Sequence, residues 1–431
     1  MQIRSKALLL VAVMLMTVSG FTLAQSDEVT FRCYQDGSEC DVYTDLLATF
    51  TEDTGIDVRV DIVPYANVDE QLPLQVEAGE APDMARITNF GIYDGQYLDA
   101  SEYISEEEAE AWLANYPGPI LDAMSNGVEG ALGGFPDAFT VTGPYINETL
   151  FELAGVELPD AETATWEDWT AAGAEVQEAL STDELTVYAI AMDRTGHRFA
   201  GPAMTMGATL INDEGMFTVD TEGYREMAML LNRWHEEGIT PQEVWIGSGG
   251  SLANAVDLFV NGQLAVYETG SWNIGNFGEN IGGNFDWAAI PNPQGAGGST
   301  GVAGGAAVAA FAQTDNPEEV AQVLAYLTSE EVGREFAERT LSLSANSAVA
   351  EGGLEYQTEN EDIVAALNVF AAEVPKLQDQ AAALNVNPFA FAYYRNSADR
   401  ITQYLVGELT LEEALAALQE DIDDAVDAAT E

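Results

Sequence analysis

The sequence predicts an α/β protein with more than one domain. Residues 28–34 have the apolar alternation of a strand, residues 41–55 form a helical stretch, and residues 56–65 alternate again. Strand, helix and strand in that order are typical of a parallel strand pair joined by a right-handed crossover. The chain has 431 residues, more than one hydrophobic core usually serves, so two domains are expected.

The next elements continue this alternation. Residues 72–87 predict a helix closed by Gly79 and then a short strand that reaches Arg86. A helix capped by Thr165 is expected over residues 165–180, followed by a strand over residues 185–193. The pattern of alternating helices and strands therefore persists through the middle of the chain.

The later part of the chain is mostly helical. A helix closed by Gly238 is expected from residue 221. Residues 292–312 are rich in Gly and Ala, but their second half, AAVAAF, has a small-residue strand pattern, so this segment belongs inside a domain rather than to a linker. Further helices are expected over residues 316–340, 361–374, 391–407 and 410–431.

The N-terminus has the pattern of a secretory signal peptide. Arg4 and Lys6 precede an apolar run, and the small-residue exit TLAQ follows, which predicts removal of residues 1–24 by cleavage near Ala24. No cysteine lies at that exit, so a free periplasmic or extracellular protein is expected rather than a lipoprotein. Beyond Gln25 no apolar stretch reaches the roughly 20 residues that cross a bilayer.

The charge balance excludes several classes of partner. The chain has 73 acidic residues against 14 Lys and Arg, a net charge of -59. A nucleic-acid partner is excluded because phosphate backbones need clusters of Lys and Arg. Anionic membranes and strongly anionic ligands are disfavoured for the same reason. A solvated acidic surface accounts for the charge, and a cation-attracting role stays open.

Cys33 and Cys40 are the two cysteines of the chain. In an exported protein they are expected to form a disulfide, and two free, partly buried thiols are the alternative. No metal is expected, because His197 and His235 are the only histidines and neither has metal-ligand spacing to the cysteines.

Motifs that carry chemistry are missing from the sequence. It contains no Gly-x-Ser-x-Gly, no His-Glu-x-x-His and no Gly-x-x-x-x-Gly-Lys. The glycines of GVAGGAA lack the strand-to-helix context of a dinucleotide fingerprint. The carboxylates are too numerous to single out a catalytic pair. Neither an enzyme nor a cofactor is therefore expected.

Several segments, in order, are similar to those of one known family. They include EAGEAPDMARI, GIYDGQYLDASEYI, GALGGFPDAF, FVNGQLAVYETGSW, WAAIPNPQGAGG and GELTLEEALAALQEDI. Each is weak alone, but together they cover nearly the whole chain. The sequence resembles the carbohydrate-binding solute-binding proteins of ABC importers, the maltose-binding-protein-like family.

This resemblance implies a two-lobe periplasmic-binding-protein fold. Each lobe would be a twisted, mostly parallel sheet flanked by helices, with the ligand in the cleft between the lobes. The N-terminal lobe is expected to comprise residues 27–138 and 291–327, and the C-terminal lobe residues 139–290 and 328–431. Chain crossings are expected near residues 135–142 and 289–293, and a third near Leu327.

The resemblance also implies the function. A monomer would close on a neutral mono- or oligosaccharide by hinge bending and deliver it to the permease subunits of an ABC importer. The alternatives are a receptor for a cationic ligand such as a polyamine, a polysaccharide-active enzyme on the same scaffold, and an adhesin or sensor subunit.

Ligands of open α/β sheets bind beyond the carboxyl ends of strands. Sugars place C–H faces on aromatic rings and hydroxyls on planar donors and acceptors. Trp272 follows the expected strand LAVYET, where the family has a sugar platform, although it could instead cap the sheet. Arg86 ends the third strand and is expected to pair with a ligand hydroxyl or with a carboxylate of its own lobe. The family makes its first ligand contacts at the position of Tyr34, Gln35 and Asp36.

The remaining candidate ligand contacts lie at other strand ends and at the crossings. Trp245 would form a second aromatic wall or pack locally, and His197 and Arg198 would contact ligand or pair with carboxylates. Small residues would let backbone N–H groups reach the ligand. The full set of these further candidates is Asp137, Phe139, His197, Arg198, Trp245, Gly301, Ala303, Gly304, Phe389 and Tyr393.

Overall fold

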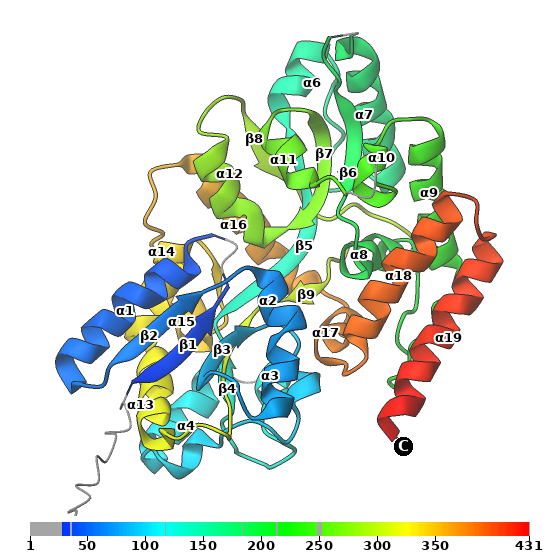
Figure 1. Ribbon diagram of the computed structural model, residues 1–431. Coiled ribbons are helices and arrows are strands. Elements are labelled where there is room, and N and C mark those ends of the chain that lie inside the picture. Colours follow the sequence, from blue (N-terminus) through cyan, green and yellow to red (C-terminus); the bar gives the residue numbers. More distant parts are fainter. Residues whose placement is uncertain are drawn as a thin grey trace, which may run out of the picture.

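The computed structural model describes residues 28–34, 37–116, 118–182, 184–212, 214–247 and 252–430 of the chain (Figure 1). The expected signal peptide, residues 1–24, lies outside these residues, as do Gln35 and Asp36.

The first sheet contains the N-terminal strands. Its order is β2-β1-β3-β10-β4. β1 pairs in parallel with β2 and β3, as the strand-helix-strand order predicts, whereas β10 is antiparallel to β3 and β4. The strands are β1 (Val29–Cys33), β2 (Val58–Ile62), β3 (Met84–Ile87), β4 (Gly134–Pro136) and β10 (Ala307–Ala310).

Helices bury this sheet by apolar faces. Phe50 lies one turn after Leu46 and Leu47 on α1, and these three side chains share one buried cluster with Phe31 and Val308 of the sheet. Gly79 ends α3 in the left-handed conformation that glycine adopts without strain, as predicted. The helices are α1 (Glu39–Thr54), α2 (Tyr65–Glu70), α3 (Leu72–Ala78), η1 (Gly91–Tyr93), η2 (Ala100–Glu102), α4 (Glu106–Asn115), α5 (Pro119–Ala123), α13 (Pro317–Leu327) and α14 (Glu330–Thr340).

The second sheet is built around one long strand. β5 pairs antiparallel with β7, β8, β9 and β11, and β6 joins the sheet in parallel with β7. All seven residues of β7 are buried, which matches its position between two strands and below helices. The strands are β5 (Ala138–Asn147), β6 (Tyr188–Met192), β7 (Leu264–Gly270), β8 (Trp287–Ala289), β9 (Ala303–Gly304) and β11 (Leu343–Ser344).

The helix α7 (Trp166–Leu180) begins after Thr165, the cap that the sequence predicts. Thr165 and Asp168 exchange side-chain and backbone hydrogen bonds in a capping box, and Trp166 and Trp169 are buried behind it. The helices are α6 (Glu148–Ala154), α7 (Trp166–Leu180), α8 (Gly196–Thr205), α9 (Glu222–Glu236), α10 (Gln242–Trp245), α11 (Ala255–Val260), η3 (Ser271–Asn273), α12 (Ile274–Asn280), α15 (Ser347–Gly352), α16 (Glu361–Glu373), η4 (Val374–Lys376), α17 (Asp379–Val386), α18 (Ala390–Leu405) and α19 (Leu411–Thr430).

The chain passes between the two sheets at three places. It leaves the first sheet at Asp137, between β4 and β5, as expected. It returns between β9 and β10, later than the expected residues 289–293, because β9 still pairs with β5. The third passage is at the turn after α14, also later than Leu327, because Phe336 of α14 packs in the cluster of the first sheet.

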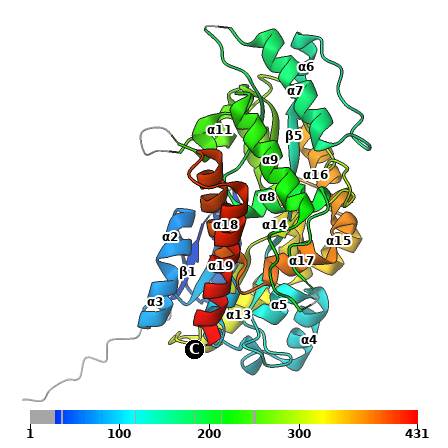
Figure 2. The same cartoon turned by 90° about the vertical axis from the view of Figure 1, so that its right-hand side faces the viewer.

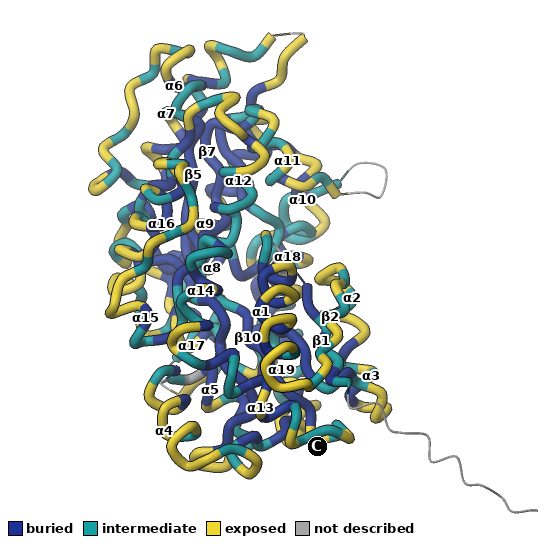
Figure 3. Tube along the Cα trace, turned by 90° about the vertical axis from the view of Figure 1, so that its left-hand side faces the viewer, coloured by how far each residue is buried: buried dark blue, intermediate teal, exposed yellow. Residues whose placement is uncertain are grey.

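The expected division into lobes at fixed residues stays a prediction. Figure 1 shows the two sheets in separate parts of the molecule with β5 running between them. Figure 1 also shows α18 and α19 side by side at the right of the molecule, and Figure 2 shows this side facing the viewer, with α19 in front. In Figure 3 the strands β5, β7 and β10 are among the buried segments. Among the described residues, no helix has both the length and the apolar character that crossing a membrane needs.

Candidate functional site

A cavity of about 610 Å³ lies where the two sheets meet. This volume is within the usual range for small-molecule sites. Aromatic rings reach its wall from strand β5, from the residue after β1, and from α2, η3 and α18. Those rings belong to Tyr34, Tyr65, Phe139, Trp272, Phe391 and Tyr394.

Trp272 lies on the cavity wall in η3, directly after β7. A Cβ added to Gly270 would lie 2.0 Å from Cζ3 of the indole, so the strand can end beneath this ring only with glycine. The guanidinium of Arg198 lies 4.2 Å from the ring centroid, a distance at which the cation is attracted to the ring. Gly270 and Arg198 together therefore hold the indole at the cavity.

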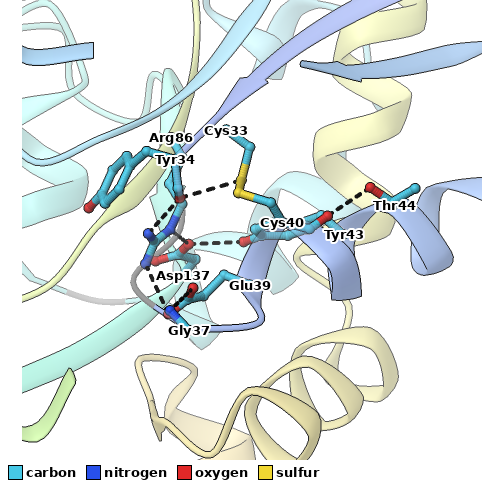
Figure 4. The surroundings of a disulfide bond; sticks show 9 residues. All are labelled: Cys33, Tyr34, Gly37, Glu39, Cys40, Tyr43, Thr44, Arg86 and Asp137. Atoms are coloured by element: carbon cyan, nitrogen blue, oxygen red, sulfur yellow. Dashed lines mark hydrogen bonds and ion pairs between the residues drawn. A yellow bond between two sulfur atoms is a disulfide. The ribbon is translucent and has the colours of Figure 1, made fainter. Parts of the chain in front are cut away.

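Arg86 forms a buried network at the floor of the cavity (Figure 4). Its Nε donates to Oδ2 of Asp137 at 2.7 Å, and its Nη1 donates to the carbonyl of Tyr34 at 3.0 Å. The hydroxyl of Tyr43 donates to the same Asp137 oxygen at 3.1 Å. Arg86 was expected to pair with a ligand hydroxyl or with a carboxylate of its own lobe. The structure shows the second, with Asp137 as the carboxylate. Asp137 does not line the cavity; it holds Arg86 from behind.

His197 and Arg198 begin α8 at another strand end, and both line the cavity. Burial and the neighbouring Arg198 cation lower the pKa of His197 to about 3, so its ring is neutral at ordinary pH. Its Nε2 lies 3.4 Å from the carbonyl of Ala303. Arg198 lies 3.7 Å from Asp193, which accepts hydrogen bonds from Tyr267 and Thr269. Arg198 thus pairs with a carboxylate, one of the two expectations for it.

Two further arginines on the cavity wall are also paired. Arg194 donates to Asp399 at 2.6 Å. Arg395 of α18 pairs with Asp69 of α2, so this pair joins elements on opposite sides of the cavity. Each of the four cavity arginines therefore has a carboxylate partner, although the chain holds only 14 Lys and Arg. The wall carboxylates Asp69 and Asp399 are therefore already in ion pairs with arginines.

Several residues predicted to contact ligand do not reach the cavity. Trp245 is fully buried and donates its indole N–H to the carbonyl of Met192, so the alternative of local packing is the one found. Gly301 permits close approach to β5, since an added Cβ would lie 2.3 Å from the carbonyl of Thr142. Ala303, whose carbonyl contacts the His197 ring, does not line the cavity. Gly304 does line the cavity.

Near the start of α18, the cavity is lined by neighbours of Phe389 and Tyr393 and not by these two expected residues. Tyr393 is buried and stacks on Phe217 at 5.1 Å, and Phe389 packs against the same core; neither lines the cavity. Because α18 begins at Ala390, residues one position apart point about 100° apart. The residues of α18 that line the cavity recur every three to four positions, and this periodicity could have been found in the sequence. These residues are Phe391, Tyr394, Arg395, Ala398 and Asp399.

Other wall residues carried no usable signal in the sequence. They come from segments whose position depends on which elements pack together. Among these residues are Glu39, Tyr65, Asp69, Thr88, Leu367, Asn385 and residues 340–343. Arg194, Thr195 and Ser271 also line the cavity, and their positions after β6 and β7 are a signal that the sequence reasoning missed. Within the described part of the chain, no three His, Cys, Asp or Glu side chains are grouped as a metal ion would need.

Glu268 is a fully buried carboxyl close to this wall, on β7. Neither of its side-chain oxygens has a hydrogen-bond partner among the described residues. Burial, reinforced by Asp193, raises the pKa of Glu268 well above its usual value. A raised pKa in the folded state means that the folded protein binds this proton more tightly, so the contribution to stability is lost as pH rises above about 4.3.

We expect Glu268→Gln to stabilise the protein by about 1 to 3 kcal/mol at pH 7.5, because it removes a carboxyl that resists ionisation. Since Gln does not titrate, the gain should be smaller at pH 5. Denaturant unfolding of both proteins at the two pH values measures it. A gain that is equal at both values, or a loss at pH 7.5, contradicts the assignment.

Comparison with known proteins gives a family and a fold. Residues 45–366 match the family of bacterial extracellular solute-binding proteins. The galactooligosaccharide-binding protein of Bacillus subtilis (strain 168) is 24% identical over 356 residues, covering 80% of this chain and 80% of that protein. A binding protein of Brucella abortus (strain 2308) is 23% identical over 333 residues, covering 73% of this chain and 74% of its own length.

Solved structures are similar over most of the chain. The GacH receptor of Streptomyces glaucescens is 20% identical with a TM-score of 0.73, covering 91% of this chain and 96% of that one. The maltotriose binding protein of Thermus thermophilus is 16% identical with a TM-score of 0.70, covering 92% of this chain and 100% of that one. This likeness confirms the α/β two-lobe fold that the sequence predicts. The sheets are mixed and not mostly parallel as expected, because β10 is antiparallel to its neighbours and β5 pairs antiparallel with four strands.

Proposed function

Because this chain belongs to the family of bacterial extracellular solute-binding proteins, we propose that it binds a neutral mono- or oligosaccharide and delivers it to an ABC importer. It is a solute-binding protein of the cell exterior or periplasm, and we propose that its signal peptide is cleaved near Ala24 and that it works as a monomer without catalysis. The permease subunits of the importer are its proposed partners.

The observation that carries the sugar assignment is the set of aromatic rings on both sides of one cavity. Tyr34 and Tyr65 reach it from the first sheet and its helices, and Trp272 and Tyr394 from the second part. Aromatic faces favour the C–H faces of sugar rings. Paired arginines supply planar donors for hydroxyl groups without adding an uncompensated charge.

Relatives and structural neighbours support the same ligand class. The Bacillus subtilis relative is named for galactooligosaccharide binding. The GacH receptor was solved in complex with acarbose, and the Thermus thermophilus protein with maltotriose. These names belong to those proteins, and they make oligosaccharides the first ligands to test here.

The same cavity disfavours a cationic ligand. Four arginines line it, and Asp69 and Asp399 are already engaged by Arg395 and Arg194. A polyamine would have to displace an arginine from its carboxylate. We therefore place the neutral carbohydrate ahead of the cation. Closure by hinge bending at the passages between the sheets is part of the proposal, with Asp137 at the first passage.

A thermal-shift panel of carbohydrates tests this function. A ligand that binds only the folded protein should raise its stability by about 2.7 kcal/mol at a concentration of 100 times Kd, and the rise should be logarithmic in concentration. We expect at least one mono- or oligosaccharide to do so, whereas spermidine should not. A response to amines alone would overturn the proposal, and reducing ends released during prolonged incubation would indicate an enzyme.

A further inference from the structure

The disulfide joins two elements that meet under the cavity. Cys33 is the last residue of β1, Cys40 lies in the first turn of α1, and both are fully buried. The expected disulfide is thus present, and the alternative of two free thiols is not found. It links the end of β1 to the start of α1 (Figure 4), and the described residues beside the two cysteines, Tyr34 and residues 37–39, are called the turn below.

The residues that touch the cavity are the immediate chain neighbours of these cysteines. Tyr34 follows Cys33, and Glu39 precedes Cys40; both line the cavity. A Sγ atom of the disulfide lies 3.6 Å from the carbonyl oxygen of Tyr34. Because each wall residue is one peptide bond from a cysteine, the disulfide limits how far the two can move apart.

That turn is tied to the buried arginine network. The ring of Tyr34 lies 4.4 Å from the Arg86 guanidinium, and its carbonyl accepts from Arg86. Glu39 lies 4.0 Å from another Arg86 nitrogen and accepts from the backbone N–H of Gly37 at 2.9 Å. Tyr43, one turn further along α1, reaches Asp137, the carboxylate partner of Arg86. The strand end, the helix start and the passage between the sheets therefore meet at one guanidinium.

We propose that the Cys33–Cys40 disulfide positions Tyr34 and Glu39 for ligand, so that breaking it weakens binding while the fold persists. A turn held in its binding conformation has less entropy to lose when ligand binds, and a flexible turn has more. The part of this proposal that concerns affinity rests on the proposed carbohydrate function. The part that concerns the turn does not.

The test is the double variant Cys33→Ala/Cys40→Ala, which leaves no free thiol. Calorimetry with maltotriose is the first probe, or with the tightest-binding panel sugar where wild type does not bind maltotriose. We expect Kd to rise about tenfold in the double variant. Leu47→Ala is the matched control, because Leu47 is buried on the same helix away from the cavity. It should lower stability and leave Kd unchanged.

Reduction of the wild type gives an independent check. Dithiothreitol supplies the two electrons, each sulfur takes up a proton, and mass spectrometry reports the two added hydrogens. Reduced wild type should bind as weakly as the double variant, and reoxidation should restore its Kd. The double variant should not respond to dithiothreitol. Unchanged Kd in both the double variant and the reduced protein would overturn the proposal.

Hydrogen exchange tests the turn without any ligand. The amide of Gly37 should exchange at least tenfold faster in the double variant, relative to amides of β1, because its acceptor Glu39 is no longer held. If no sugar binds the wild type, the proposed carbohydrate function is wrong. The exchange rate of Gly37 still tests whether the disulfide holds Glu39 in place. Unchanged exchange at Gly37 would then refute it, and faster exchange would uphold it.

Discussion

Replacing Trp272 by alanine is expected to weaken carbohydrate binding at least tenfold while the fold is unchanged. The indole lies on the cavity wall, held between the glycine end of β7 and the Arg198 guanidinium. Loss of a large aromatic contact from a ligand site costs about 2 kcal/mol or more, and 1.4 kcal/mol corresponds to a tenfold change in Kd. Calorimetry with the best panel sugar measures the change.

Trp245→Phe is the matched control for this prediction. Trp245 is buried away from the cavity, and its indole N–H donates to Met192. The variant should lose about 1 kcal/mol of stability with the lost hydrogen bond and keep its affinity. Gly270→Ala should weaken binding as Trp272→Ala does, because the new Cβ displaces the indole. If Trp272→Ala binds sugar with unaltered affinity, the alternative role holds, in which Trp272 only caps the sheet.

Replacing Asp137 by alanine is expected to destabilise the protein by about 3 to 5 kcal/mol, the usual cost of leaving a buried charge without its partner. Arg86 and Asp137 are both buried, and Asp137 accepts from Arg86 and from Tyr43. Losing one acidic residue reduces the excess negative charge of a chain whose net charge is -59, so relief of repulsion works against the predicted loss of stability. Denaturant unfolding gives the free energy.

Two further variants test whether the predicted loss of stability is specific to the buried Arg86–Asp137 ion pair. Asp220→Ala removes a carboxylate from an exposed pair with Arg225 and should change stability by less than about 1 kcal/mol. The double variant Arg86→Met/Asp137→Leu removes both charges and should lose less than half of what Asp137→Ala loses. A loss in Asp137→Ala no larger than that of Asp220→Ala would show that the buried network contributes little.

Much of the fold was predictable from local patterns. The parallel pairing of β1 with β2, the cap at Thr165 and the helix end at Gly79 each depend on residues close in the sequence. The passages between the sheets were less predictable. The chain returns to the first sheet only after β9, because both residues of this short strand still pair with β5. That pairing joins segments far apart in the sequence.

The candidate site was predictable where a strand end pointed to it. Tyr34, Arg86, His197 and Trp272 follow or end strands, and all four line the cavity. Tyr393 does not line the cavity, because the rotation of α18 presents Tyr394 to it instead. Their roles in binding a ligand stay predictions that the variants above address.

The sequence by itself determined the class of the protein, through its alternating strands and helices and through the ordered segments that resemble the carbohydrate-binding solute-binding proteins. It also determined which side chains stand at the ends of strands, because that depends only on where each strand stops. The tertiary structure alone decided which of them share a wall. Arg86 meets Asp137, and Arg395 meets Asp69, across separations of 51 and 326 residues. The first pair forms only once β10 brings β3 and β4 into one sheet, and the second only once α2 and α18 lie on opposite sides of the cavity.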